Sequence, residues 1–359
     1  MANVSQEPGA FFQTDAEIAK QKEKEAKYNY TEGDAIKLPK KVLNICLDKD
    51  QKYLYVADAG HRVAKVSLAS SKVVKAFKGH TGPVTSLAVT DTHLWTGSWD
   101  KTIKKWDLNT GDCIGTLEGH TDFVKSLVLV GNFLYSGSSD CYLRRWDIHT
   151  LECRGVEKKH SRAIESLAAT EDGKFIYSAS SDGKVLKWDA NTLQVVGALE
   201  GHETSIYCVR VSNDDVWTAS ADKTVRRFNQ QGVQDMELAH PDRVKSILIA
   251  NPYIVSGSSD DSIRVWDIGS TNLVCTIEGH FDEVGCLDIA GATLYSGSLD
   301  QSVRKWSLTK ESIKKYNETR EVKLKRLAAE EEEKKKKDSG LTEEEEKELA
   351  ELMSSDNDE

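Results

Sequence analysis

The sequence lacks the features that mark several classes of protein. No run of about 18 apolar residues occurs in its 359 residues, and the first thirty residues contain no apolar core of a signal peptide. The seven cysteines are scattered, odd in number and never spaced as CxxC, a distribution typical of reduced thiols rather than of disulfides or a zinc site. These absences predict a cytoplasmic or nuclear protein that is not inserted in a membrane.

Motifs of common enzyme classes are absent as well. The sequence has no glycine-rich phosphate loop and no HExxH motif, so we expect no enzymatic activity, no cofactor and no metal site. Its formal net charge of -10 argues against a dedicated nucleic-acid-binding domain, which is usually basic. Proteins or peptides are therefore the expected partners, and RNA is less favoured.

The most informative feature is an internal repeat with a period of about 40 residues. Each unit has a histidine near its start, an aspartate in a turn, and an aromatic residue six positions after that aspartate. The histidines are His80, His120, His160, His202, His240 and His280; the aspartates are Asp100, Asp140, Asp182, Asp222, Asp260 and Asp300; the aromatic residues are Trp106, Trp146, Trp188, Phe228, Trp266 and Trp306. Short alternating segments such as VTSLAV, bounded by Gly, Asp, Asn and Ser, predict four strands per unit.

The GH and WD dipeptides, kept in register at this spacing, resemble the WD-repeat family. The resemblance covers residues 41–308 and implies an all-β fold, a seven-bladed β-propeller. Residues 41–79 form a degenerate first unit, in which Gly60 replaces the aspartate and Val66 replaces the tryptophan.

Closure of the ring requires one more strand, because the last unit offers only three before the chain turns helical. We expect DAIKLP, residues 34–39, to supply it and so protect an exposed sheet edge. The predicted organisation is a flexible segment with a short helix (1–32), the propeller (33–308), a charged single helix (309–337) and an acidic tail with a short helix (338–359).

Resemblance to the family implies that the histidine, the aspartate, a strand serine or threonine and the tryptophan form a hydrogen-bonded tetrad within each blade. The set contains the residue types of a hydrolase, but no nucleophile elbow or oxyanion-hole motif accompanies it, so we interpret it as structural. A fully satisfied buried network fixes one geometry. Phe228 has no N–H group, and the blade with His202 and Asp222 is expected to lack one partner.

The resemblance also implies where a partner binds: at the third and fifth residues after each histidine and at the residue before each turn aspartate. Trp99 stands out, because four other units have Ser or Ala directly before their turn aspartate. We expect a protein or peptide site centred on Pro83, Trp99, Phe123 and Lys125, with Tyr207, Arg243 and Lys245 as outlying contacts. The alternative is that Trp99 only packs over a neighbouring loop.

Basic residues precede the aromatic landmark in five units, where the family usually has an apolar residue. They are Lys105, Arg145, Lys187, Arg227 and Lys305, and only Val265 follows the family pattern. Long basic side chains can pack their stems and keep their charged heads in water. The alternative is a basic band that binds an acidic tail or RNA.

Both ends of the chain are predicted to be helical and charged. Glutamates and lysines four residues apart, from Glu330 with Lys334 to Glu333 with Lys337, favour a helix surrounded by solvent. The acidic tail places Leu349, Leu352 and Met353 near one face, as in a helix that folds on a basic partner. Ubiquitin binding and phosphorylation of the tail are weaker alternatives. Phe11 and Phe12 form either a docking motif or a disordered lead-in.

These features together predict a non-enzymatic adaptor, monomeric within a larger complex. Its propeller would hold one protein or peptide on the narrow face, while the C-terminal helix and acidic tail contact a second partner. The alternatives are a subunit of an RNA-processing or ribosome-assembly particle, and a ubiquitin-ligase-associated substrate receptor. No F-box or RING segment is present, so a ligase role would need another subunit.

Overall fold

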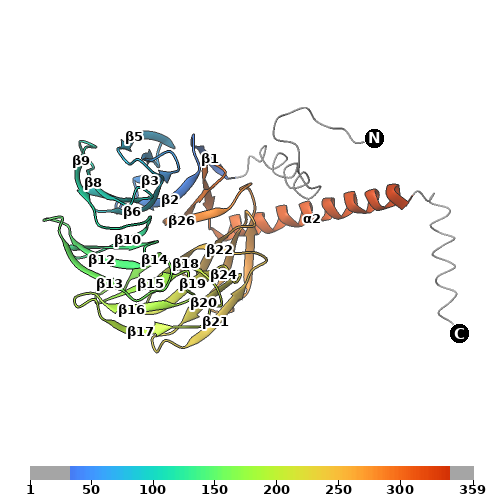
Figure 1. The fold of residues 1–359 in the computed structure, drawn as a ribbon. Helices are drawn as coiled ribbons and strands as arrows, with labels where there is room; N and C mark the ends of the chain where they lie inside the picture. The colour runs from blue at the N-terminus through green and yellow to red at the C-terminus, as the bar shows by residue number, and fades with distance from the viewer. Residues whose placement is uncertain (1–32, 340–359) are drawn as a thin grey trace, which may run out of the picture. The chain divides into compact units, whose positions relative to one another are not determined.

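The computed structural model describes residues 33–339 and divides the chain into two units, Met1–Thr309 and Lys310–Glu359. The first unit consists of seven four-stranded antiparallel sheets, the blades of a propeller (Figure 1). The predicted short N-terminal helix, Phe11 and Phe12, and the acidic tail lie outside the described residues.

Six blades are built from strands consecutive in the chain. Blade 1 holds β2(Val42–Leu47), β3(Tyr53–Asp58), β4(Arg62–Ser67) and β5(Lys72–Lys78); blade 2 holds β6(Val84–Val89), β7(His93–Ser98), β8(Ile103–Asp107) and β9(Cys113–Leu117); blade 3 holds β10(Val124–Val130), β11(Phe133–Ser138), β12(Tyr142–Asp147) and β13(Cys153–Lys158). Blade 4 holds β14(Ile164–Ala169), β15(Phe175–Ser180), β16(Val185–Asp189) and β17(Val195–Leu199); blade 5 holds β18(Ile206–Ser212), β19(Asp215–Ser220), β20(Thr224–Phe228) and β21(Gln234–Ala239); blade 6 holds β22(Val244–Ala250), β23(Tyr253–Ser258), β24(Ile263–Asp267) and β25(Leu273–Ile277).

The seventh blade combines the two ends of the propeller. It holds β26(Val284–Ala290), β27(Thr293–Ser298) and β28(Ser302–Ser307), and its outer strand is β1(Asp34–Lys37). β1 pairs antiparallel with β28, with Ile36 opposite Val303. Each innermost strand packs against the innermost strand of the next blade, and β26 packs against β2, so the ring has no open seam.

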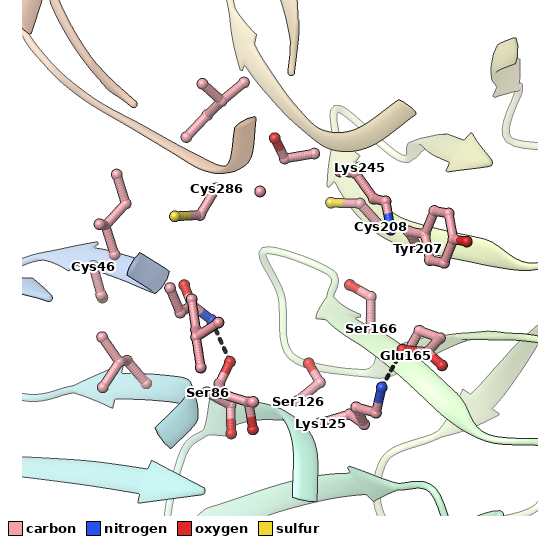
Figure 2. Close-up of a pocket in the computed structure, with 18 of the residues that line it drawn as sticks. Cys46, Ser86, Lys125, Ser126, Glu165, Ser166, Tyr207, Cys208, Lys245 and Cys286 are labelled. Carbon is pink, nitrogen blue, oxygen red and sulfur yellow. Dashed lines mark hydrogen bonds and ion pairs between the residues drawn. The ribbon is translucent and has the colours of Figure 1, made fainter. Parts of the chain in front are cut away.

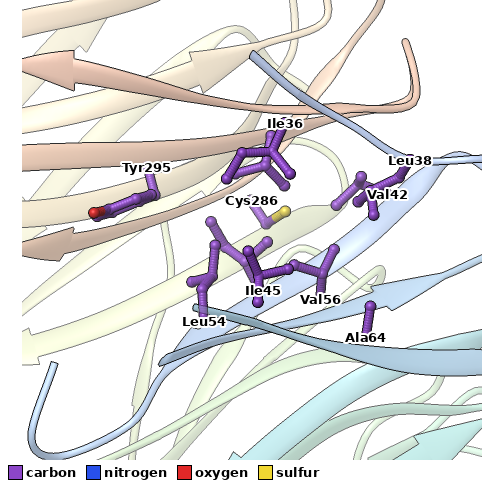
Figure 3. Packing of buried hydrophobic residues seen from close by; sticks show 11 residues of the cluster. Ile36, Leu38, Val42, Ile45, Leu54, Val56, Ala64, Cys286 and Tyr295 are labelled. Carbon is purple, nitrogen blue, oxygen red and sulfur yellow. The ribbon is translucent and has the colours of Figure 1, made fainter. Parts of the chain in front are cut away.

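The hydrophobic core lies between adjacent sheets. At the junction of blades 7 and 1, Ile36 from β1 and Tyr295 from β27 pack with Val42, Ile45 and Leu54 of blade 1 (Figure 3). The second strand of each blade is almost wholly buried, whereas most outer strands are largely exposed.

The glycine before the landmark histidine has a clear structural reason in blade 2. Gly79 has φ 153°, and a Cβ atom at this position would lie 3.1 Å from the ring of Trp106. Only glycine accommodates both this backbone conformation and the ring above it.

The second unit contains the helix α2(Lys310–Ser339), whose side chains are described mainly up to Arg326. Lys314 and Glu318 form an ion pair at 3.8 Å on its exposed surface. The predicted pairs from Glu330 to Lys337 involve side chains outside the described set. Within residues 33–339, no helix is both long and apolar enough to cross a membrane.

Candidate functional site

The landmark residues of blade 3 form a buried hydrogen-bonded tetrad. Nδ1 of His120 lies 2.8 Å from Asp140, and its Nε2 lies 2.7 Å from the hydroxyl of Ser136. Because the carboxylate only accepts, Nδ1 carries the proton and Nε2 accepts from the hydroxyl. Nε1 of Trp146 donates to the same hydroxyl oxygen at 2.8 Å. Each polar group of the tetrad therefore has a partner.

Three other blades contain the same tetrad. They are His80, Asp100, Thr96 and Trp106 in blade 2; His160, Asp182, Ser178 and Trp188 in blade 4; and His280, Asp300, Ser296 and Trp306 in blade 7. In blade 5, His202 bonds Asp222 and Thr218 at 2.7 Å each, and Phe228 is buried where the tryptophan would be. The Thr218 hydroxyl also lies 3.3 Å from the carbonyl of Arg226.

The tetrads are arranged for structure and not for nucleophilic catalysis. Ser136 is fully buried, its proton is directed to His120 and one of its lone pairs receives the Trp146 N–H. No substrate can reach this oxygen without opening the blade. Burial alone would raise the pKa of Asp140, but hydrogen bonds from His120, Tyr142 and Thr121 outweigh it and hold that pKa at about 2.

The prediction of a complete tetrad in blade 6 is wrong, because His240 and Asp260 are not bonded to each other. Nδ1 of His240 donates to the carbonyl of Leu238 at 3.0 Å, while Asp260 is bound by both terminal nitrogens of Arg264, at 2.7 and 3.1 Å. His240 still contacts Ser256 at 2.8 Å, and Trp266 donates to that hydroxyl at 3.3 Å.

One difference of blade 6 lies in the residue that follows the histidine. In blades 2, 3, 4 and 7 the backbone N–H of this residue donates to the turn aspartate, at distances from 2.9 to 3.3 Å. In blade 6 that residue is Pro241, which has no N–H group. The carboxylate of Asp260 therefore lacks one of its usual donors, and the Arg264 guanidinium takes its place. The proline was visible in the sequence as a signal that this blade differs.

The innermost strands of all seven blades line a central channel with a volume of about 350 Å³ (Figure 2). Among the predicted partner residues, Lys125, Tyr207 and Lys245 line it, and Arg243 does not. Two of them are engaged by charges from the next blade: Lys125 pairs with Glu165 at 3.1 Å, and Lys245 pairs with Glu283 at 3.4 Å.

Lys245 also stands over the ring of Tyr207, 3.9 Å from its centroid. The structure thus brings Tyr207 and Lys245 together, although they come from different blades. Because Glu165 and Glu283 neutralise the two lysines, the mouth of the channel is not a simple cationic site. The role of these glutamates depends on contacts between blades, which the sequence does not reveal.

A second group of predicted residues meets at the same end of the strands. Trp99 stacks on Phe123 of the next blade, with ring centroids 4.7 Å apart and planes tilted by 13°. The backbone N–H of Trp99 donates to the carbonyl of Pro83 at 2.9 Å, and Phe123 lies two residues before Lys125. Trp99 remains 41 % exposed. It therefore packs over a neighbouring loop and still presents aromatic surface to solvent.

The basic residues before the aromatic landmark are built into the propeller. Each faces the residue paired with it on the second strand of its own blade, and the pairs are Trp95 with Lys105, Tyr135 with Arg145, Tyr177 with Lys187, Trp217 with Arg227 and Tyr295 with Lys305. Degenerate blade 1 pairs Tyr55 with Lys65 in the same way. In blade 6, where the basic residue is replaced by Val265, its partner is Val255. Lys105, Lys187, Arg227 and Lys65 lie over the ring of the paired residue, and Arg145 lies over Phe133, so cation–π contact accounts for most of these cations.

Comparison with known proteins identifies the repeat. The family model described as "WD domain, G-beta repeat" matches six segments, residues 71–107, 111–147, 151–189, 193–229, 233–267 and 271–307. Their ends coincide with the third strand of blades 2 to 7. Blade 1 is not among the matched segments, in keeping with its lack of the landmark aspartate and tryptophan.

Similar proteins differ greatly in how much of their length is shared. An uncharacterized WD repeat-containing protein of Schizosaccharomyces pombe is 34% identical over 302 residues, 77% of this chain and 82% of that protein. Protein Rae1 of Drosophila melanogaster is 38% identical over 73 residues, 21% of its length. A probable E3 ubiquitin ligase complex SCF subunit, sconB, of Talaromyces stipitatus is 56% identical over 39 residues, only 6% of its length. The last two matches extend over one or two repeats.

Proposed function

The chain belongs to the WD-repeat family, and from this premise we propose that it is an adaptor whose propeller binds a protein or peptide at the Trp99–Phe123 stack. Propellers of this family are generally interaction scaffolds, so the fold alone does not select a partner. The residues that the loops display at the channel mouth must therefore determine which partner binds.

The exposed stack is the observation that carries the proposal. The backbone N–H of Trp99 is bonded to Pro83 and its ring stacks on Phe123, so in this proposal the stack positions the ring before a partner binds. A preordered aromatic residue loses little conformational entropy on binding. Tryptophan is also among the residues most enriched in interface hot spots.

Lys125, Tyr207 and Lys245 extend this surface across the channel mouth, and Arg243 directly precedes β22(Val244–Ala250), the strand that contains Lys245. Their charges are partly neutralised by Glu165 and Glu283. In this proposal they orient the partner, while the Trp99 ring provides most of the binding free energy. The C-terminal helix and the acidic segment 338–359 contact a second partner, and the protein acts as a monomer within a cytoplasmic or nuclear complex.

The RNA alternative depended on a basic band together with the C-terminal tail, and charged heads of the band are bonded to other groups of the propeller. Lys105 donates to the carbonyl of Ile148, and Arg227 is bound by Asp235. A role as a ubiquitin-ligase substrate receptor is suggested only by similarity over 39 residues to the SCF subunit sconB. The adaptor proposal is therefore preferred to both.

Replacement of Trp99 tests the proposal. We expect Trp99→Ala to remove the principal partner from affinity purifications of the full chain, analysed by quantitative mass spectrometry, at little cost in thermal stability. Ile114→Ala is the matched control, because Ile114 is an exposed apolar residue of the same blade on its outer strand. Unchanged recovery of every partner by Trp99→Ala would exclude this site.

Salt distinguishes this proposal from the RNA alternative. An RNA complex should weaken log-linearly and steeply as salt is added, because bound counterions are released. A complex anchored by Trp99 should change little over the same range. A chain ending at Leu308 should keep this partner and lose the second one.

A further inference from the structure

Three junctions between blades share one contact. At each, the basic residue before the aromatic landmark crosses to the next blade and donates to a main-chain carbonyl in the turn after its third strand. The pairs are Lys105 with Ile148 at 2.8 Å, Arg145 with Ala190 at 3.1 Å, and Lys305 with Leu68 at 3.4 Å. The accepting residue is always the second one after the aromatic landmark or its replacement.

In blades 1 and 4 the corresponding lysine does not form this bond. Lys65 lies 4.0 Å above the ring of Tyr53, and Lys187 lies 4.1 Å above the ring of Phe175. Both rings belong to the first residue of the second strand. At this position the blades whose lysine crosses have His93 and Thr293. A tyrosine or phenylalanine there therefore retains the lysine in its own blade.

Retention of Lys65 leaves a pocket of about 450 Å³ between blades 1 and 2. Tyr53, Leu108 and Asn109 are among the residues that line it. Leu108 occupies the position of the accepting residue at the other junctions, yet its carbonyl accepts no hydrogen bond from the residues that the structure describes. The carbonyl of Asn109 is already bonded to Lys75 at 2.8 Å.

The pocket also offers a carboxylate. One oxygen of Asp48 accepts the backbone N–H groups of Lys52 and Tyr53, at 2.8 and 2.7 Å, and within residues 33–339 no hydrogen bond reaches its other oxygen. The lining contains three carboxylates and three lysines, namely Asp48, Asp50, Asp91, Lys49, Lys52 and Lys65. The charges of these six side chains sum to zero, so the lining has no net positive charge that would repel a further cation.

We propose that this pocket binds an arginine side chain of a partner protein. The guanidinium would take the position that a basic side chain of the same molecule takes at the three bonded junctions. It would donate to the carbonyl of Leu108 and to Asp48, and lie beside the Tyr53 ring. Arginine suits this set better than lysine, because its planar fork donates in two directions and stacks on aromatic rings.

This site is separate from the proposed partner surface. Asp91 and Trp99 flank opposite ends of β7(His93–Ser98), so the pocket opens at the other end of the strands. A partner bound at Trp99 would not contact it. The inference therefore does not depend on the proposed function.

The test uses the full-length protein and N-acetyl-arginine-N′-methylamide as the probe. Binding is followed by the carbon-13 ring signals of labelled tyrosines, with Tyr53 assigned from the variant Tyr53→Phe. We expect the probe to bind weakly, with a Kd of about 1 to 10 mM. The citrulline analogue has the same shape without the charge and should not bind.

Lys65→Arg is the decisive variant, because an arginine at this position can span the junction as Arg145 does. It should weaken probe binding at least about tenfold and raise the melting temperature by about 1 to 2 °C. Lys187→Arg, at the other junction with a retained lysine, is the matched control and should bind the probe like the unmodified chain. Absence of binding, equal binding by Lys65→Arg, or equal binding of the citrulline analogue or of putrescine would each overturn the proposal.

Discussion

Blade 3 and blade 6 have the same four strands and the same landmark residues, yet their buried polar groups are bonded differently. In blade 3, Asp140 is bound by His120 and by backbone N–H groups. In blade 6, Asp260 is bound by Arg264, and His240 turns to a backbone carbonyl. Both blades keep the contact of the histidine with the strand hydroxyl and the bond from the tryptophan to that hydroxyl.

Blade 1, like blade 6, contains an aspartate that is bonded to an arginine. Asp58 is fully buried there and bonded to Arg62 at 2.8 Å, again an arginine four residues after the aspartate. The repeat thus requires that a carboxylate at this end of the blade be neutralised and hydrogen-bonded, and either histidine with backbone donors or arginine can do so. In blade 6, Pro241 provides no N–H group and Arg264 binds the carboxylate, whereas in blade 5 the histidine–aspartate bond is kept although no N–H of Glu203 reaches Asp222 among the described residues.

The largest expected effect is that of replacing a landmark tryptophan. Trp146 is 2 % exposed and donates at 2.8 Å, whereas Trp266 is 9 % exposed and donates at 3.3 Å. Trp146→Ala should lower the free energy of unfolding by about 3 to 5 kcal/mol, and Trp266→Ala by about 1 kcal/mol less. Urea unfolding of both variants measures this difference. A neutral Trp146→Ala would mean that the tetrad does not support the blade.

A smaller effect than that of Trp146→Ala should appear in the dependence of stability on pH. Burial lowers the pKa of His240 from 6.5 to about 4. The unfolded chain therefore binds a proton that the folded chain does not bind between these two pH values, so this histidine makes stability fall as the pH falls from about 6.5 to 4. The loss should reach about 2 to 3 kcal/mol.

Blade 3 should lose its contribution in a lower pH window. The pKa of Asp140 is held at about 2, below its ordinary value of 3.8, so the stability it provides is lost only as the pH falls through that interval.

The variant His240→Gln isolates the blade 6 contribution, since glutamine does not titrate. Its unfolding free energy, measured by urea from pH 7 to 4, should change less than that of the unmodified chain; an identical slope would contradict the assignment.

The repeat made much of this architecture predictable. Three landmarks in step six times predicted the strands and the seven blades, and the positions counted from each histidine were sufficient to group Trp99 with Phe123 in one site. Tetrads in four blades involve the expected residues because the same spacing recurs in each. Periodicity is informative here since every unit must bury the same face against its neighbour.

What could not be predicted depends on contacts between units. The bond from Lys105 to Ile148, and its absence at Lys65, follow from which ring lies beneath each lysine, and this requires the register between strands. The neutralisation of Lys125 by Glu165 likewise joins two blades. Pro241 was visible, but its effect could be recognised only once the donors of the other aspartates were known.

The smallest expected effect is that of removing the turn aspartate of blade 6. It distinguishes a carboxylate bound by arginine from one bound by histidine and backbone N–H groups. Asp260→Ala should cost about 2 kcal/mol, because it leaves Arg264 buried without its anion; the cost stays at the low end since Asp260 is 22 % exposed. Adding Arg264→Met should recover most of that loss, because both charged groups are then removed.

In blade 3 the equivalent pair of changes should behave differently. Asp140→Ala leaves His120 and two backbone N–H groups without an acceptor, and Arg144, four residues later, forms no ion pair with Asp140 among the described residues. Adding Arg144→Met should therefore recover nothing. A double-mutant cycle in each blade, followed by urea unfolding, measures the two coupling free energies; equal coupling in both would mean that the arginine in blade 6 merely lies near the carboxylate, and that the histidine of that blade supports the fold by another route.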